Sequence, residues 1–139
     1  MKKLTLRNTQ TFFIAVALCL ALLPVSNGYA AGNIYRVKST GLASGACGDT
    51  WENACTLQNA LSLSTAGDQI WVAKGTHKPT SGKDRMATFN LKSGVAIYGG
   101  FLGSETDLSQ RNPVTNVTVL SGDIGVAGTK TDNSYHVVN

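Results

Sequence analysis

The sequence predicts a mainly β protein, built of short strands that polar turns separate. Beyond residue 30 the chain is rich in Gly, Ser, Thr, Asn and Val and poor in charge, a composition typical of β-structure with many turns. The clearest strand is 69–73 (QIWVA), in which Ile70 and Val72 point to one side and Trp71 to the other. No two-residue Asn-Gly or Asp-Gly turn joins neighbouring strands, so antiparallel hairpins are not required and stacked parallel strands remain open.

The first thirty residues are predicted to be a cleavable secretory signal peptide. Three basic side chains lie within residues 1–7, and the apolar stretch 12–25 follows them. This stretch is shorter than the roughly 20 residues that a membrane-spanning helix needs. Small residues before and at Ala30 place the cleavage after that residue. An uncleaved membrane anchor and lipid attachment at Cys19 are the weaker alternatives, so we expect a protein that is secreted or displayed at the cell surface.

Cleavage changes what the charge implies. The whole chain carries a formal charge of +4, but residues 31–139 keep nine basic and eight acidic side chains, a net charge of +1. The high pI is therefore mostly a property of the signal peptide. The remainder has no basic run, so nucleic-acid partners are not predicted, and neither is a membrane span after cleavage.

Two cysteines, Cys47 and Cys55, remain in the segment ACGDTWENAC. In an exported protein such a close pair is most simply a local disulfide. Free thiols and a metal site are the alternatives. A metal site would need further thiol or imidazole ligands, and His77 and His136 lie far away in sequence.

The remaining elements follow from apolar spacing. A first strand is expected at 34–37, followed by a loop that glycines interrupt. Thr50 is the expected cap of an amphipathic helix that runs to Ser64. The spacing of three and four puts these residues on one helix face: Trp51, Ala54, Leu57, Ala60 and Leu61. Besides 69–73, later strands are expected at 88–92, 95–99, 117–121 and 135–138.

Several phrases resemble a known fold family. Residues 67–76 (GDQIWVAKGT) resemble the opening pattern of right-handed parallel β-helix proteins of the pectin-lyase-like superfamily, although His77 stands where that pattern usually has Tyr. The later phrases VAIYGGFLGSETDLSQRN and TVLSGDIG are similar to the N-terminal parts of bacterial secreted or surface members. The resemblance implies a right-handed parallel β-helix and is specific for the fold rather than for an activity.

The resemblance implies a division of the chain into three parts. Residues 1–30 form the signal peptide, and residues 31–66 hold an N-terminal strand, the disulfide loop and a capping helix. Leu57 and Leu61 would cover the open end of the coil stack. Residues 67–139 would form the first coils. Strands are expected up to the last residues without a closing cap, so we expect this to be the N-terminal portion of a longer β-helix.

Catalytic and metal-binding residues are not predicted. Polysaccharide lyases on this fold bind calcium with clustered acids and use an Arg or Lys as base, and calcium needs 6–8 oxygen ligands. Here the acids are scattered along the chain: Asp68, Asp84, Glu105, Asp107, Asp123 and Asp132. Arg85 and Arg111 lack an acidic cluster in their own segments. No cofactor is expected, and calcium would enter only if the full-length protein were a lyase.

Two groups of residues are candidate binding sites. Trp71, Tyr98 and Phe101 could form an aromatic platform for sugar rings, although packing against the core explains them more simply. Glu105, Asp107 and Arg111 share the long loop between the strands at 95–99 and 117–121, and could form a small polar site. Turn formation and solvation are the simpler roles of these charges.

The leading hypothesis is an exported, non-catalytic surface, adhesin-like or structural module. Its expected partners are an extracellular polysaccharide or a host or cell surface. The rival is the N-terminal part of a polysaccharide lyase or glycoside hydrolase whose active site lies beyond residue 139. A non-functional remnant is the third reading.

Overall fold

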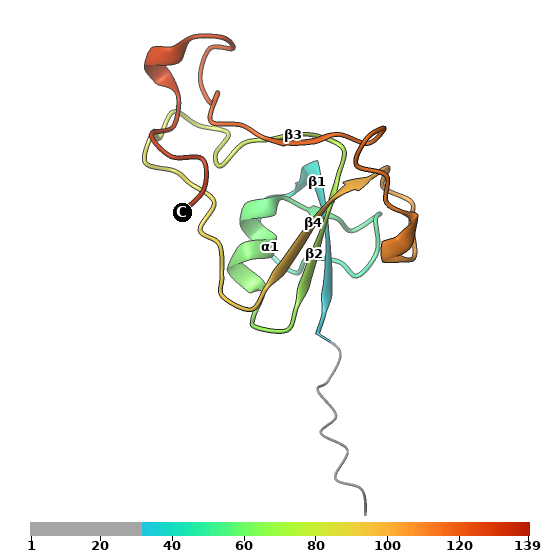
Figure 1. Ribbon diagram of the computed structural model, residues 1–139. Coiled ribbons are helices and arrows are strands. Elements are labelled where there is room, and N and C mark those ends of the chain that lie inside the picture. The colour runs from blue at the N-terminus through green and yellow to red at the C-terminus, as the bar shows by residue number, and fades with distance from the viewer. Residues whose placement is uncertain (1–31) are drawn as a thin grey trace, which may run out of the picture.

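The computed structural model describes residues 32–139; the predicted signal peptide and Cys19 lie outside the described residues. The described part is a small mixed α/β domain (Figure 1). In chain order the elements are β1 (Ile34–Leu42), α1 (Leu57–Leu63), β2 (Gln69–Ala73), β3 (Gly75–His77), β4 (Ala96–Phe101), the 3-10 turn η1 (Leu108–Gln110), β5 (Thr118–Leu120) and the 3-10 turn η2 (Lys130–Asp132).

All strand pairs are parallel. A three-stranded sheet has the order β1-β2-β4, with Ile34 beside Gln69 and Gln69 beside Ala96. A two-stranded sheet joins β3 to β5, with Gly75 beside Thr118. Parallel neighbours require crossover connections, which agrees with the absence of hairpin turns in the sequence.

The larger sheet separates two apolar clusters. Ile70 and Val72 of β2 pack with α1 in the first cluster, whereas Trp71 and Ala73 belong to the second. Figure 1 shows α1 lying beside this sheet. The two-residue alternation that the sequence predicts for β2 is thus confirmed, because successive strand side chains point to opposite faces.

The helix begins later than expected. Thr56, and not Thr50, is its N-cap, and the Thr56 hydroxyl accepts a hydrogen bond from the backbone N–H of Asn59 at 3.3 Å. Cys55 is extended and makes parallel bridges to Val37 and Leu42 of β1, so a helix that starts at Thr50 cannot continue through it. Trp51, predicted on the helix face, instead packs in the second cluster with Phe101.

The prediction of a right-handed parallel β-helix is wrong for the described residues. They form two separate short parallel sheets and one helix, without a repeated coil. Leu57 and Leu61, expected to cover the end of a coil stack, pack in the cluster of Val37 and Ile70. Apolar residues that a solenoid would bury in a column are here buried between a sheet and a helix.

Two predicted strands are not formed as strands, and one strand is formed that the sequence does not predict. The segments 88–92 and 135–138 contribute only a single parallel bridge, between Phe89 and Val138. Phe89 is fully buried, so its apolar side chain reflects packing rather than an extended ladder. Conversely, β3 was not expected, because Gly75-Thr76-His77 has no apolar alternation and is a strand only through its pairing with β5.

Candidate functional site

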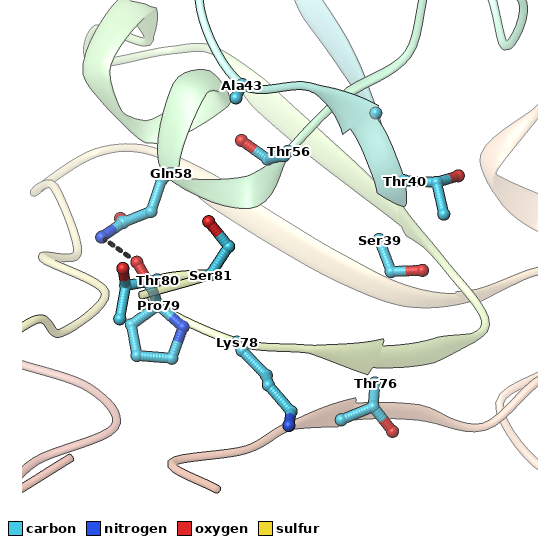
Figure 2. A pocket seen from close by; sticks show the side chains of 11 residues that line it. Ser39, Thr40, Ala43, Thr56, Gln58, Thr76, Lys78, Pro79, Thr80 and Ser81 are labelled. Carbon is cyan, nitrogen blue, oxygen red and sulfur yellow. Dashed lines mark hydrogen bonds between the residues drawn. The ribbon is translucent and has the colours of Figure 1, made fainter. Parts of the chain in front are cut away.

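A groove of about 530 Å³ lies beside the C-terminal end of β1, and we call it the hydroxyl groove. Six of the residues that line it carry hydroxyl groups: Ser39, Thr40, Thr56, Thr76, Thr80 and Ser81. Figure 2 shows β1 on one side, the start of α1 with Gln58 on another, and β3 with the segment that follows it below. The volume is in the range of small-molecule binding sites.

The disulfide loop positions one wall of the groove. Cys47 and Cys55 are joined by a disulfide with a Cα–Cα distance of 5.3 Å, as the sequence predicted. The backbone N–H of Leu42 donates to Ala54 O at 3.0 Å, and that of Thr56 donates to Leu42 O at 2.9 Å. Gly41 lies so close to the Cys55 backbone that a Cβ there would collide with it. The loop is therefore seated directly on β1.

The opposite wall is held by Gln58. Its side-chain amide donates to the carbonyl of Pro79 at 3.0 Å and to that of Thr88 at 2.9 Å, and Pro79 itself is buried (Figure 2). These bonds fix the segment that follows β3 against the helix. Two elements far apart in the sequence thus face one another across the groove.

Much of the polar lining is free to bind. Among the residues that the structure describes, four of the hydroxyl side chains have no hydrogen-bond partner: Ser39, Thr40, Thr76 and Ser81. Lys78 contributes the one ammonium group of the lining, and no lining residue is acidic. The groove therefore offers donors, acceptors and a single positive charge, but no carboxylate to act as an acid or base.

The predicted aromatic platform is mostly inside the domain. Trp71 is 3% exposed and Phe101 is 0% exposed, and their rings stack with centroids 4.8 Å apart. Tyr98 is half-buried, with the Arg111 guanidinium 5.6 Å from its ring centroid. The structure brings these rings together as packing, which leaves the faces of Trp71 and Phe101 inaccessible to a sugar.

The three residues of the predicted polar site do not bond to one another, and each makes contacts of its own. Burial alone would raise the pKa of Glu105, but backbone N–H groups of Leu102, Gly103 and Ser104 donate to its carboxylate and lower the pKa overall. Asp107 caps η1, and its bonds with Ser109 lower the pKa of its carboxyl. Both acids form turns, and Arg111 packs over Tyr98 instead of pairing with them.

Two buried titratable residues stabilise the strands. Asp68 joins the starts of β1 and β2, because it accepts from the N–H of Thr65 at 2.8 Å and of Asn33 at 2.7 Å. The Thr65 N–H is the main cause that lowers its pKa. Burial lowers the pKa of His77, whose Nε2 lies 3.0 Å from the carbonyl oxygen of Ala73.

Sequence reasoning missed the hydroxyl groove. Its lining consists of small polar residues, which are typical of turns and carry no motif of their own. The bonds of Gln58 to the carbonyls of Pro79 and Thr88 bring the residues after β3 against the start of α1, and the sequence gives no sign of them. The one sequence signal near the groove is the cysteine pair, which predicts where the loop is fastened to its neighbours.

Neither a metal cluster nor a membrane helix is found in the described part of the chain. Across residues 32–139, no three His, Cys, Asp or Glu side chains gather into a group that could hold a metal ion. Within the same range, none of the helices has the length and apolar character that crossing a membrane demands. The disulfide is consistent with an oxidising, extracellular environment. No protein-family model, curated protein or solved structure matches the chain.

Proposed function

We propose that this protein is an exported, non-catalytic module that binds an extracellular polysaccharide or cell-surface glycan in the hydroxyl groove. The observation that carries the proposal is the set of unpaired hydroxyls around one concave surface. Sugars present alternating donors and acceptors, and a hydroxyl can serve as either. The exposed methyl group of Ala43 supplies apolar contact area beside these polar groups.

Export is supported by two independent features. The basic and apolar pattern of residues 1–30 is that of a secretory signal. The pair Cys47 and Cys55 is bonded, and structural disulfides persist in oxidising compartments. A module that meets polysaccharide outside the cytoplasm needs both delivery and resistance to unfolding, and the bridge adds to the latter.

Binding is favoured over hydrolysis by the residue types in the groove. Glycoside hydrolases generally place two carboxyl groups on either side of the scissile bond. The groove lining has hydroxyls, one amide and the Lys78 ammonium, so it has the groups for holding a sugar but lacks this carboxylate pair. Affinity should be modest, because the groove is open and its exposed side chains lose freedom when they bind.

The test is retention of the purified protein on an array of neutral and acidic bacterial and plant oligosaccharides, followed by titration calorimetry with the best binder. Thr76→Val removes one groove hydroxyl without changing the side-chain shape, and Thr115→Val is the matched control outside the groove. We expect Thr76→Val to weaken binding about threefold to tenfold, as for one lost hydrogen bond. The control should bind like the unmodified protein.

A second pair of variants tests the charge. Lys78→Gln removes the groove ammonium, whereas Lys74→Gln removes another exposed ammonium, four residues earlier, that does not line the groove. A loss of affinity for an acidic glycan only in Lys78→Gln supports the assignment. Retention on no glycan, or equal effects of groove and control variants, contradicts it. Recovery of shortened or unsaturated sugars would replace the binding module with an enzyme.

A further inference from the structure

A second groove lies farther along α1, toward the C-terminal end of the helix. It has a volume of about 340 Å³, and we call it the α1 groove; its lining residues are Gln58, Leu61, Ser62, Asn90 and Lys92. Gln58 also lines the hydroxyl groove, so the two grooves meet at this residue. Both linings carry hydroxyl, amide and ammonium groups, and neither contains an acidic residue.

The helix α1 supplies one continuous wall for both grooves. Its N-cap Thr56 lines the hydroxyl groove, and Leu61 and Ser62 line the α1 groove. Residues three and four apart lie on the same helix face, so Gln58, Leu61 and Ser62 follow one another on one side of α1. Four residues of helix advance by about 6 Å. The two grooves are therefore successive parts of one surface along the helix.

The wall opposite α1 is fixed by side-chain bonds at both ends of the α1 groove. Gln58 Nε2 donates to Pro79 O at 3.0 Å, a bond that Figure 2 shows, and to Thr88 O at 2.9 Å. Lys92 Nζ donates to two carbonyl oxygens at the end of α1, at 3.0 and 2.8 Å. Between these bonds Phe89 is fully buried in the first apolar cluster. The segment 88–92 is thus held along the helix at three points.

The same segment is bonded to the end of the chain. The backbone N–H of Leu91 donates to Asn139 O at 2.8 Å, and the side-chain amide of Asn139 donates to Asn90 Oδ1 at 3.3 Å. Both walls of the α1 groove are therefore ordered before any ligand arrives. A surface that is already ordered loses less conformational freedom on binding.

We propose that the ligand of the hydroxyl groove is a linear glycan bound along its length, with consecutive sugar units in the hydroxyl groove and in the α1 groove. This inference rests on the proposed glycan binding and adds the form of the ligand. A single terminal sugar, or the tip of a branched glycan, would occupy only one of the two grooves. A linear chain repeats its donors and acceptors from unit to unit, and the two grooves repeat the hydroxyl and amide groups that can bond to them.

Affinity should then depend on the length of the chain. A short oligosaccharide that fills the hydroxyl groove makes only the first set of contacts. A longer one adds contacts in the α1 groove without a second loss of overall translational and rotational freedom. Two further hydrogen bonds should therefore strengthen binding by about tenfold.

The test is titration calorimetry with linear oligosaccharides of graded length, from disaccharides upward. The neutral probes are cello-, xylo- and chito-oligosaccharides, and the acidic probes are hyaluronan and alginate oligosaccharides. Ser62→Leu fills the α1 groove from an exposed helix position. Ser104→Leu makes the same change at an exposed position outside both grooves and is the matched control. Thr76→Val again marks the hydroxyl groove.

We expect the unmodified protein and Ser104→Leu to bind long chains about tenfold more tightly than short ones. Ser62→Leu should lose this gain and still bind short chains, which also shows that the variant is folded. Thr76→Val should weaken the binding of short and long chains by the same factor.

The inference is overturned if the unmodified protein binds short and long chains equally, a result that needs no variant. It is also overturned if Ser62→Leu keeps the full gain with length. In both cases, short-chain binding that Thr76→Val weakens would leave the proposed glycan binding in place. Binding at no length would contradict the proposed function as well.

Discussion

Removing the Cys47–Cys55 bridge tests how the wall of the hydroxyl groove is stabilised. The bridge closes a loop of about nine residues, and in the chain-entropy description such a loop contributes about 2.5 kcal/mol by restricting the unfolded state. Small domains are stable by only about 5–15 kcal/mol, so this is a large share. In the folded state the loop keeps its backbone bonds to Leu42, so the native structure should persist without the bridge.

Two ways of breaking the bridge separate its contributions. Reduction of the unmodified protein leaves both sulfurs in place, and should lower the free energy of unfolding by about 2.5 kcal/mol. The double variant Cys47→Ala/Cys55→Ala also removes the sulfur of Cys55, which is 0% exposed, and should cost about 1 kcal/mol more. Alanine is chosen over serine because a hydroxyl would be buried there without an assured partner.

The assay is urea unfolding followed by tryptophan fluorescence, with and without reductant. At a slope of about 1.5 kcal/mol per molar urea, the midpoint of the unmodified protein should fall by about 1.7 M on reduction. The double variant is its own control, because it should not respond to reductant. A fall of less than about 0.3 M on reduction would refute the reasoning. So would a change in the native far-UV spectrum, which would mean that the bridge shapes the folded state.

Two further predictions concern the strand starts and the groove. Asp68→Asn should lower stability by about 1–2 kcal/mol at neutral pH, because the carboxylate that accepts from Asn33 and Thr65 is lost. The lowered pKa of Asp68 favours the folded state above about pH 4, and this stability is lost as the pH falls through the folded pKa. The unfolding free energy of Asp68→Asn should therefore fall less steeply in acid than that of the unmodified protein. Gly41→Ala should cost about 1–3 kcal/mol in urea unfolding, because its Cβ meets the Cys55 backbone. Gly82→Ala meets only an ordinary contact and is the control; equal costs would contradict the close approach in the groove wall.

What could be predicted from the sequence was local. The alternation of β2 requires only that neighbouring side chains point to opposite faces. It can be read from residues 69–73 alone. The cysteine pair is equally local, since eight residues separate its members. Both predictions hold because no distant segment can overturn them.

The helix start depended on a distant partner. Thr50 and Thr56 are equally good caps in isolation. The choice between them is made by Cys55, which bridges to Val37 and Leu42 and keeps the chain extended until Thr56. Sequence periodicity alone placed Trp51 on the helix. In the structure Trp51 instead packs with Phe101 in the second apolar cluster. Tertiary packing overrides local spacing when both faces of a sheet need cover.

The sequence predicted neither the fold nor the groove, and the reason is the same for both. The phrases around 67–76 specify a strand and a turn, but not how many sheets the later strands form. The pairing of β3 with β5, over three residues each, decides that, and β3 and the residues that follow it line the groove. Such short pairings leave almost no trace in hydrophobic pattern.

The two ends of the described chain are stabilised in different ways. The region around β1 is covalently tied by the disulfide and packed against α1. The end of the chain beyond Leu120 is held by the Phe89–Val138 bridge, by Arg85 and by the backbone bonds of one loop. Ile124 is the one buried residue among 121–139, so this end of the domain should open more readily than the region around β1 as the protein unfolds.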